Sequence, residues 1–215
     1  GGRGLPTSPT ALFPGNARRG PLEADGRSRS QEGARHRPLE RRYDSQHFAL
    51  LYPEKLGALV LTDTSSHVKP LLRLTIESWI KAAEAGGSGL RYDVALPYLF
   101  SESYTERNFE RLLALKEINI VNNPVRTLVN LSRASAAHDL GDKVSGIKAP
   151  TLIVSGEEDI LIPVKYARDL REKIAGSTLV VLKNCGHAPP IEKPDEFNEI
   201  ALEFLKRHDS LLKRK

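Results

Sequence analysis

Three short apolar segments, separated by helical sequence, constrain the fold of this chain more than any other feature. They span residues 56–61, 149–155 and 177–182, and each is continuously apolar rather than alternating. Continuous apolar character is typical of strands that are buried on both faces, as in parallel sheets covered by helices. The succession of strands and helices therefore predicts an α/β fold built on a parallel sheet.

Amphipathic sequence predicts helices around these strands. One helix ends near Pro53, and a longer one begins at Pro70 and ends before Gly86-Gly87, in keeping with proline at helix starts and glycine at helix ends. The remaining predicted helices cover residues 105–119, 124–137, 164–174 and 194–207. The helices between residues 70 and 137 interrupt the alternation with strands, which indicates an inserted helical cap.

The first 46 residues differ in amino-acid composition from the rest of the chain. They contain no valine and no isoleucine, and they hold nine arginines against five acidic residues. Such a segment cannot bury enough apolar surface to offset chain entropy, so we expect residues 1–46 to be disordered or mis-framed. Most of the net charge of +5 lies in this segment, and residues 47–215 carry 23 basic and 22 acidic residues. A nucleic-acid partner is therefore not expected.

The cysteine count and the hydropathy of the sequence bear on the cellular location of the protein and on its partners. The single cysteine excludes an intrachain disulfide framework and a cysteine-based zinc site, and it favours a reducing, cytoplasmic location. There is no apolar run of membrane-spanning length and no signal-peptide pattern, so no membrane partner is expected. The absence of methionine suggests that the true start is missing and that the chain is a fragment, with residues 209–215 as a basic tail.

Two candidate functional residues follow the second and third predicted strands. Asp159 stands three residues after Gly156, and His187 follows Gly186. Because the carboxyl ends of parallel strands share one edge of a sheet, both side chains are expected at that edge, where open α/β sheets bind ligands. A carboxylate that orients an imidazole is the acid–base pair of a hydrolytic triad.

These segments resemble the C-terminal part of the α/β-hydrolase superfamily. The matching blocks are 154–159 with Pro163, Gly186-His187 with Glu192 and Pro194, and 46–55 followed by 59–61. The resemblance implies an incomplete doubly wound parallel sheet of the α/β-hydrolase type, with core segments 47–66 and 138–208 and a cap at 67–137. It implies Asp159 as catalytic acid, His187 as catalytic base and no cofactor. The enol-lactonase and C–C-bond-hydrolase branch is the most similar one.

The family's nucleophile is missing from the chain. The resemblance calls for Gly-x-Ser-x-Gly directly before the helix that contains His47, and no such motif occurs. Read one base forward, codons for residues 31–44 can spell Lys-Lys-Ala-His-Val-Ile-Gly-His-Ser-Ser-Gly-Gly-Met. The serine codon would then straddle Leu39 and Glu40. We therefore hypothesise a shifted reading frame that ends near Ser45, and we expect the chain as written to be inactive.

The parent protein is expected to hydrolyse a small-molecule ester, lactone or related carbonyl compound. Two alternatives stay open: a non-catalytic ligand-binding or signalling relative, and a translated sequence with no role of its own. The apolar cap sequence favours an uncharged or mostly apolar substrate. Trp79 is predicted to lie in the cap core or to line the substrate site.

The remaining candidates are assigned structural roles. Cys185 is expected to be a small buried side chain, and neither Ser45 nor Ser155 has the glycine neighbours of a nucleophile. No metal site is expected, because the other histidines show no ligand spacing; they are His36, His47, His67, His138 and His208.

Overall fold

The computed structural model describes residues 45–208. Its core is a three-stranded parallel sheet in the order β1–β2–β3, formed by β1 (Leu59–Thr62), β2 (Thr151–Gly156) and β3 (Thr178–Leu182). Leu59 is paired with Thr151 in β2, and Leu152 is paired with Thr178 in β3. The predicted α/β class and parallel sheet are confirmed. Within the described residues the outer edge of β1 has no strand partner, as expected of an incomplete sheet.

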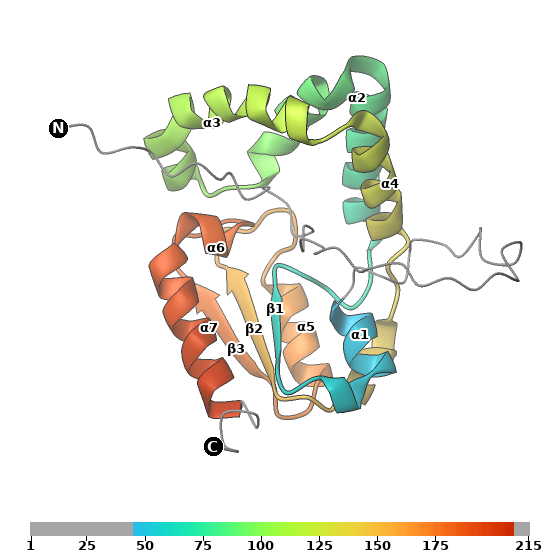
Figure 1. Cartoon of the computed structure of the whole chain (residues 1–215), viewed down its shortest axis with the longest axis vertical. Coiled ribbons are helices and arrows are strands. Elements are labelled where there is room, and N and C mark those ends of the chain that lie inside the picture. The colour runs from blue at the N-terminus through green and yellow to red at the C-terminus, as the bar shows by residue number, and fades with distance from the viewer. Residues whose placement is uncertain (1–44, 209–215) are drawn as a thin grey trace, which may run out of the picture. The chain divides into compact units, whose positions relative to one another are not determined.

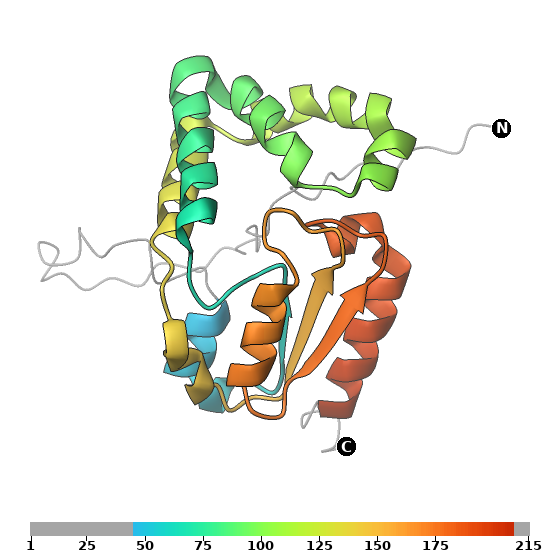
Figure 2. The same cartoon turned by 180° about the vertical axis from the view of Figure 1, so that it is seen from behind.

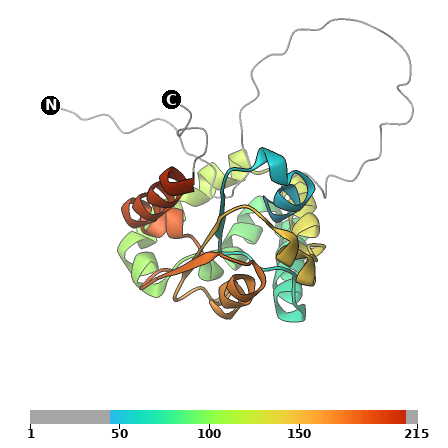
Figure 3. The same cartoon turned by 90° about the horizontal axis from the view of Figure 1, so that it is seen from below.

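Helices cover both faces of this sheet (Figures 1 and 2). On one face, Leu61 and Ile153 pack with helix α1 (Ser45–Leu51), the 3-10 helix η4 (Gly141–Gly146) and helix α5 (Lys165–Lys173). On the other face, Leu152 and Val154 pack against Phe204 of helix α7 (Pro194–His208). Successive strand residues point to opposite faces, so a strand that is apolar throughout can serve both layers. Figure 3 shows the layers from below.

Three helices form the predicted cap beyond the carboxyl ends of the strands (Figure 1). They are α2 (Pro70–Ala95), α3 (Glu102–Asn122) and α4 (Val125–Ala136), with the short helix η3 (Leu96–Tyr98) between α2 and α3. The chain leaves and re-enters the core at one place, where His67 forms a β-bridge with Asp139. There the Val68 amide donates to the carbonyl of His138. The cap is therefore an insertion between β1 and β2.

Two predicted helix boundaries differ from the structure. The helix predicted to end before Gly86 resumes after Gly87 and runs on to Ala95, with the break confined to these two glycines. Gly87 has a φ of 73°, a conformation that glycine adopts without strain, so the pair acts as a kink rather than as an end. Helix α1 begins at Ser45, two residues inside the segment predicted to lie outside the fold.

Gln46 explains the earlier start of α1. Its side chain is fully buried, and its amide nitrogen donates to Thr64 Oγ1 and to the carbonyl of Ser65, both at 3.1 Å. This ties α1 to the loop that follows β1. The predictions for residues 1–44, including the shifted reading frame, His36 and the disordered segment, lie outside the described residues, as does the basic tail 209–215.

None of the helices between residues 45 and 208 combines the length and the apolar character that a membrane crossing needs.

Candidate active site

Asp159 lies in the loop that connects β2 to α5, at the carboxyl edge of the sheet. Its side chain is fully buried, and one carboxylate oxygen, Oδ1, accepts hydrogen bonds from the backbone amides of Leu161 (2.9 Å) and Ile162 (2.8 Å). These two amide donors fix the orientation of the carboxylate. The other oxygen, Oδ2, points to the next loop.

His187 meets that oxygen from the loop after β3. The distance from His187 Nδ1 to Asp159 Oδ2 is 2.9 Å, although the residues are 28 positions apart in sequence. A carboxylate can only accept, so the pair favours the imidazole tautomer with the proton on Nδ1 and leaves Nε2 available as a base. The two residues singled out in the sequence are thus brought together in the structure.

The surroundings of His187 favour its protonated form. Burial alone would lower the pKa of His187, but the hydrogen bond to Asp159 and the negative charge of that carboxylate outweigh burial. Asp63 and Glu192 add smaller contributions of the same sign, so the pKa of His187 is raised above its ordinary value. A base that holds a proton more firmly is suited to an imidazolium intermediate.

The two loops approach each other closely at Gly156. The amide of Glu157 donates to the carbonyl of Leu182, and that of Glu158 donates to the carbonyl of Cys185, both at 2.8 Å. A Cβ atom on Gly156 would overlap the carbonyl oxygens of Cys185 and Gly186. Glycine at this position therefore allows the Asp159 loop to dock on the His187 loop.

Replacing Gly156 with alanine is expected to lower the free energy of unfolding by about 3 kcal/mol, because backbone atoms would have to move apart. Urea denaturation monitored by circular dichroism measures the change. Gly57→Ala is the matched control, since nothing lies within 4 Å of a Cβ placed there, and it is expected to change stability by less than about 0.5 kcal/mol. Equal effects of the two substitutions would contradict the close-approach argument.

Glu192 joins the histidine loop to the cap. It lies at the end of the short helix α6 (Pro189–Glu192), and its Oε1 accepts from the amide of Gly186 at 2.9 Å. Its Oε2 accepts from the hydroxyl (2.6 Å) and the amide (3.1 Å) of Ser101, the N-cap residue of α3. Glu192, which the sequence grouped with Gly186 and His187, thus links the loop after β3 to the start of α3.

Glu192→Ala is expected to lower the free energy of unfolding by about 2 to 3 kcal/mol, because it removes charge-assisted hydrogen bonds and leaves buried amides unpaired. Glu192→Gln, which retains one acceptor oxygen, should have a smaller effect. Glu196→Ala is the control, because that glutamate is exposed and forms an ion pair with Lys193, which precedes α7 by one residue. If Glu192→Ala and Glu196→Ala lower the free energy of unfolding equally in urea denaturation, the hydrogen bonds of Glu192 to the cap do not contribute to stability.

Asp63 is a third ionisable group of the site, and it was not singled out from the sequence. It follows β1 directly, and one polar atom each from Asp63, Asp159 and His187 lie within 4.8 Å of one another. The available signal was its place after a buried strand, the same signal that identified Asp159. No family block marked it, and an aspartate after a strand is commonly a solvated turn residue.

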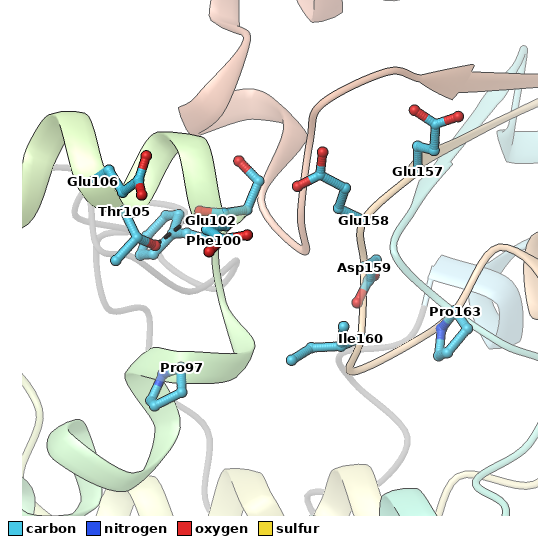
Figure 4. A pocket seen from close by; sticks show the side chains of 11 residues that line it. Pro97, Phe100, Glu102, Thr105, Glu106, Glu157, Glu158, Asp159, Ile160 and Pro163 are labelled. Carbon is cyan, nitrogen blue, oxygen red and sulfur yellow. Dashed lines mark hydrogen bonds between the residues drawn. The ribbon is translucent and has the colours of Figure 1, made fainter.

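A cleft of about 840 Å³ opens beside Asp159, between the start of α3 and the loop after β2 (Figure 4). Its lining residues are Pro97, Phe100, Ser101, Glu102, Thr105, Glu106, Glu157, Glu158, Asp159, Ile160 and Pro163. Five of them are acidic and none is basic. The cleft is thus more acidic than the apolar cap sequence suggested.

Trp79 is packed inside the cap. Only 6 % of its surface is exposed, the edge of its ring faces Tyr98, and the Arg91 guanidinium lies 4.9 Å from the ring centroid. It is not among the residues that line the cleft. The structure places it in the cap core, the first of the two predicted locations, and a role in substrate binding stays a prediction.

The other candidates take structural positions. Cys185 is fully buried between the sheet and α7, and burial, followed by the charges of Glu192 and Asp63, raises the pKa of its thiol. Ser155 is buried within β2, and Ser45 is exposed at the start of α1. His138 donates through Nε2 to the carbonyl oxygen of Ser65, at 3.0 Å.

The chain is similar to proteins of a known family. A family model described as the alpha/beta hydrolase fold matches residues 45–194. A 2-hydroxy-6-oxo-6-phenylhexa-2,4-dienoate hydrolase from Comamonas testosteroni is 31% identical over 169 residues, covering 74% of this chain and 58% of that protein. A 2-hydroxy-6-oxononadienedioate/2-hydroxy-6-oxononatrienedioate hydrolase from Escherichia coli is 29% identical, covering 77% of this chain and 59% of that protein.

Solved structures agree with this likeness. The α/β-hydrolase enzyme MGS-M2 from a deep-sea metagenome library has a TM-score of 0.66 and 29% identity, covering 75% of this chain and 60% of that one. The enol-lactonase from Burkholderia xenovorans has the same TM-score at 24% identity, with the same coverage, and supports the fold alone. The chain spans about 60% of the length of the proteins it matches.

Proposed function

Because this chain belongs to the α/β-hydrolase fold family, we propose that it is the C-terminal part of a serine-type hydrolase of ester, lactone or related carbonyl bonds. The observation that carries the proposal is the 2.9 Å hydrogen bond between His187 Nδ1 and the buried Asp159 carboxylate. The proposal assigns this pair the orienting and proton-transfer roles of a triad. The similarity to a protein named as a 2-hydroxy-6-oxo-6-phenylhexa-2,4-dienoate hydrolase supports a hydrolytic function.

In the proposed reaction, a serine supplied by the parent protein attacks the carbonyl carbon of the substrate. His187 takes the serine proton through Nε2 and passes it to the leaving group. Asp159 keeps the proton on Nδ1 and stabilises the imidazolium that forms. No serine within residues 45–208 lies in a Gly-x-Ser-x-Gly segment, so the chain by itself is proposed to be inactive.

The cleft beside Asp159 supports a substrate without negative charge. Glu102, Glu106, Glu157 and Glu158 line it together with Asp159, and none of the lining residues is a lysine or an arginine. A substrate carboxylate that entered this cleft would meet these like charges, which disfavours its binding. We therefore propose a neutral or cationic substrate in preference to a dicarboxylate. The single cysteine favours a cytoplasmic setting for this reaction.

Two observations test the proposed function. The nucleotide sequence of the gene should carry codons for Gly-His-Ser-Ser-Gly in the frame shifted by one base, and codons incompatible with that string would reject the frame hypothesis. The frame-corrected protein should then turn over short aryl esters. A corrected protein that binds such esters without hydrolysing them would instead favour a non-catalytic ligand-binding relative.

A further inference from the structure

The half-buried side chain of Asp63 lies beside His187 and uses only part of its hydrogen-bonding capacity. Its Oδ2 accepts a hydrogen bond from Thr62 Oγ1 at 2.9 Å. Its Oδ1 is shielded from solvent and has no hydrogen-bond partner among residues 45–208. Buried carboxylate oxygens normally have partners, so an unsatisfied one beside an imidazole points to a function.

The backbone at Asp63 holds the side chain in this place. Asp63 has a φ of 47°, in the left-handed region that few residues other than glycine, asparagine and aspartate adopt. Its amide donates to the carbonyl of Val154 on β2, at 3.2 Å, which fixes the turn to the neighbouring strand. Such a conformation persists where the surrounding structure enforces it, and it is frequent at functional sites.

We propose that Asp63 is a second carboxylate of the Asp159–His187 site, a positioning residue that stabilises the charged form of the same imidazole and can accept a hydrogen bond from the ring when Asp159 is neutralised. One polar atom of Asp63 lies within 4.8 Å of a ring nitrogen of His187 and of a carboxylate oxygen of Asp159, so a shift of the Asp63 carboxylate by about 2 Å would bring it to hydrogen-bond distance from the ring. The benefit for turnover rests on the hydrolase function proposed above, but the electrostatic coupling does not.

The charges around Asp63 determine how the coupling works. The pKa of Asp63 is raised to about 7, and burial is the main cause. The charge of His187 opposes this rise, and the charge of Asp159 adds to it. The Thr62 hydroxyl and the Gly156 backbone lower the pKa by smaller amounts. The loops after β1, β2 and β3 each contribute one of the three ionisable groups. The negative charge of Glu192 in α6 also raises the pKa of His187. When His187 becomes charged, Asp63 therefore loses its proton more readily and supplies a second negative charge to the imidazolium.

Nuclear magnetic resonance titration of the whole chain tests this without requiring turnover. The His187 ring resonances are assigned by comparison with His187→Gln and followed from pH 4 to pH 10 in the wild type, Asp63→Asn, Asp159→Asn and the double variant. Asparagine suits the left-handed backbone at position 63, so Asp63→Asn is expected to fold. Asp142→Asn is the control, because its side chain is 94% exposed and contacts Lys173 instead.

The expected result is that Asp63→Asn lowers the pKa of His187 by about one unit, and that the double variant lies about one unit below Asp159→Asn. The Asp63 Cγ resonance of the wild type should titrate together with the His187 ring, a reading that needs no variant. An Asp63→Asn titration that overlays the wild type, with the double variant equal to Asp159→Asn, would overturn the proposal. Either outcome leaves the hydrolase proposal to be decided by turnover.

Discussion

A frame-corrected protein with Gly-His-Ser-Ser-Gly ahead of α1 is expected to hydrolyse a short aryl ester about a million-fold faster than the chain as written. The reason is that the loss of a triad nucleophile removes the covalent step, and His187 with Asp159 then has no hydroxyl to activate. The present chain should match the uncatalysed rate within a small factor. Initial rates with 4-nitrophenyl acetate at pH 8 measure both.

Variants of the corrected protein separate the proposed roles. His187→Gln should remove nearly all of the gain, because His187 is hydrogen-bonded to the buried Asp159 carboxylate and is the proposed base. Cys185→Ala should leave the rate nearly unchanged, since this thiol is buried and its pKa is raised. Ester hydrolysis by the present chain that disappears in His187→Gln would show that a nucleophile exists without the frame correction.

The sequence predicted the site through its strands. Residues 149–155 and 177–182 are apolar throughout, so they had to be buried, and the parallel arrangement then placed Asp159 and His187 at one edge. The 2.9 Å contact agrees with that expectation. The helical backbone is interrupted at Gly86-Gly87 as the sequence predicted, but a second helical segment follows directly. Contacts with α3 support that segment, among them the hydrogen bond from the Tyr92 hydroxyl to the carbonyl of Leu112.

Asp63 and the acidic cleft could not be predicted in the same way. The φ of 47° and the burial of Asp63 arise from its contact with Val154 on the neighbouring strand, 91 residues later in the chain. The glutamates of the cleft come from two segments about 50 residues apart, at the start of α3 and after β2. Each is an ordinary surface residue in its local sequence, and only the placement of the cap over the sheet brings them together.

Asp63→Asn is expected to make the folded chain more stable than the wild type above pH 7, and by less as the pH falls. Folding raises the pKa of Asp63 from 3.8 to about 7, mainly through burial. Between these values the folded chain keeps a proton that the unfolded chain releases. The wild-type free energy of unfolding therefore falls as the pH rises through this window, at about 1.4 kcal/mol per pH unit at most.

The gain in Asp63→Asn should reach about 2 to 4 kcal/mol at pH 8 and approach zero near pH 4, after allowance for the partial exposure of the side chain. Urea denaturation at pH 4.5, 6 and 8 measures the difference. Asp142→Asn should keep the wild-type slope, because its side chain is 94% exposed. If Asp63→Asn kept that slope as well, another ionisable group would be responsible for the pH dependence of stability.

A stabilising Asp63→Asn substitution would mean instead that the fold loses stability by placing a second carboxylate beside His187. Such a loss is common where a site is built for chemistry rather than for stability.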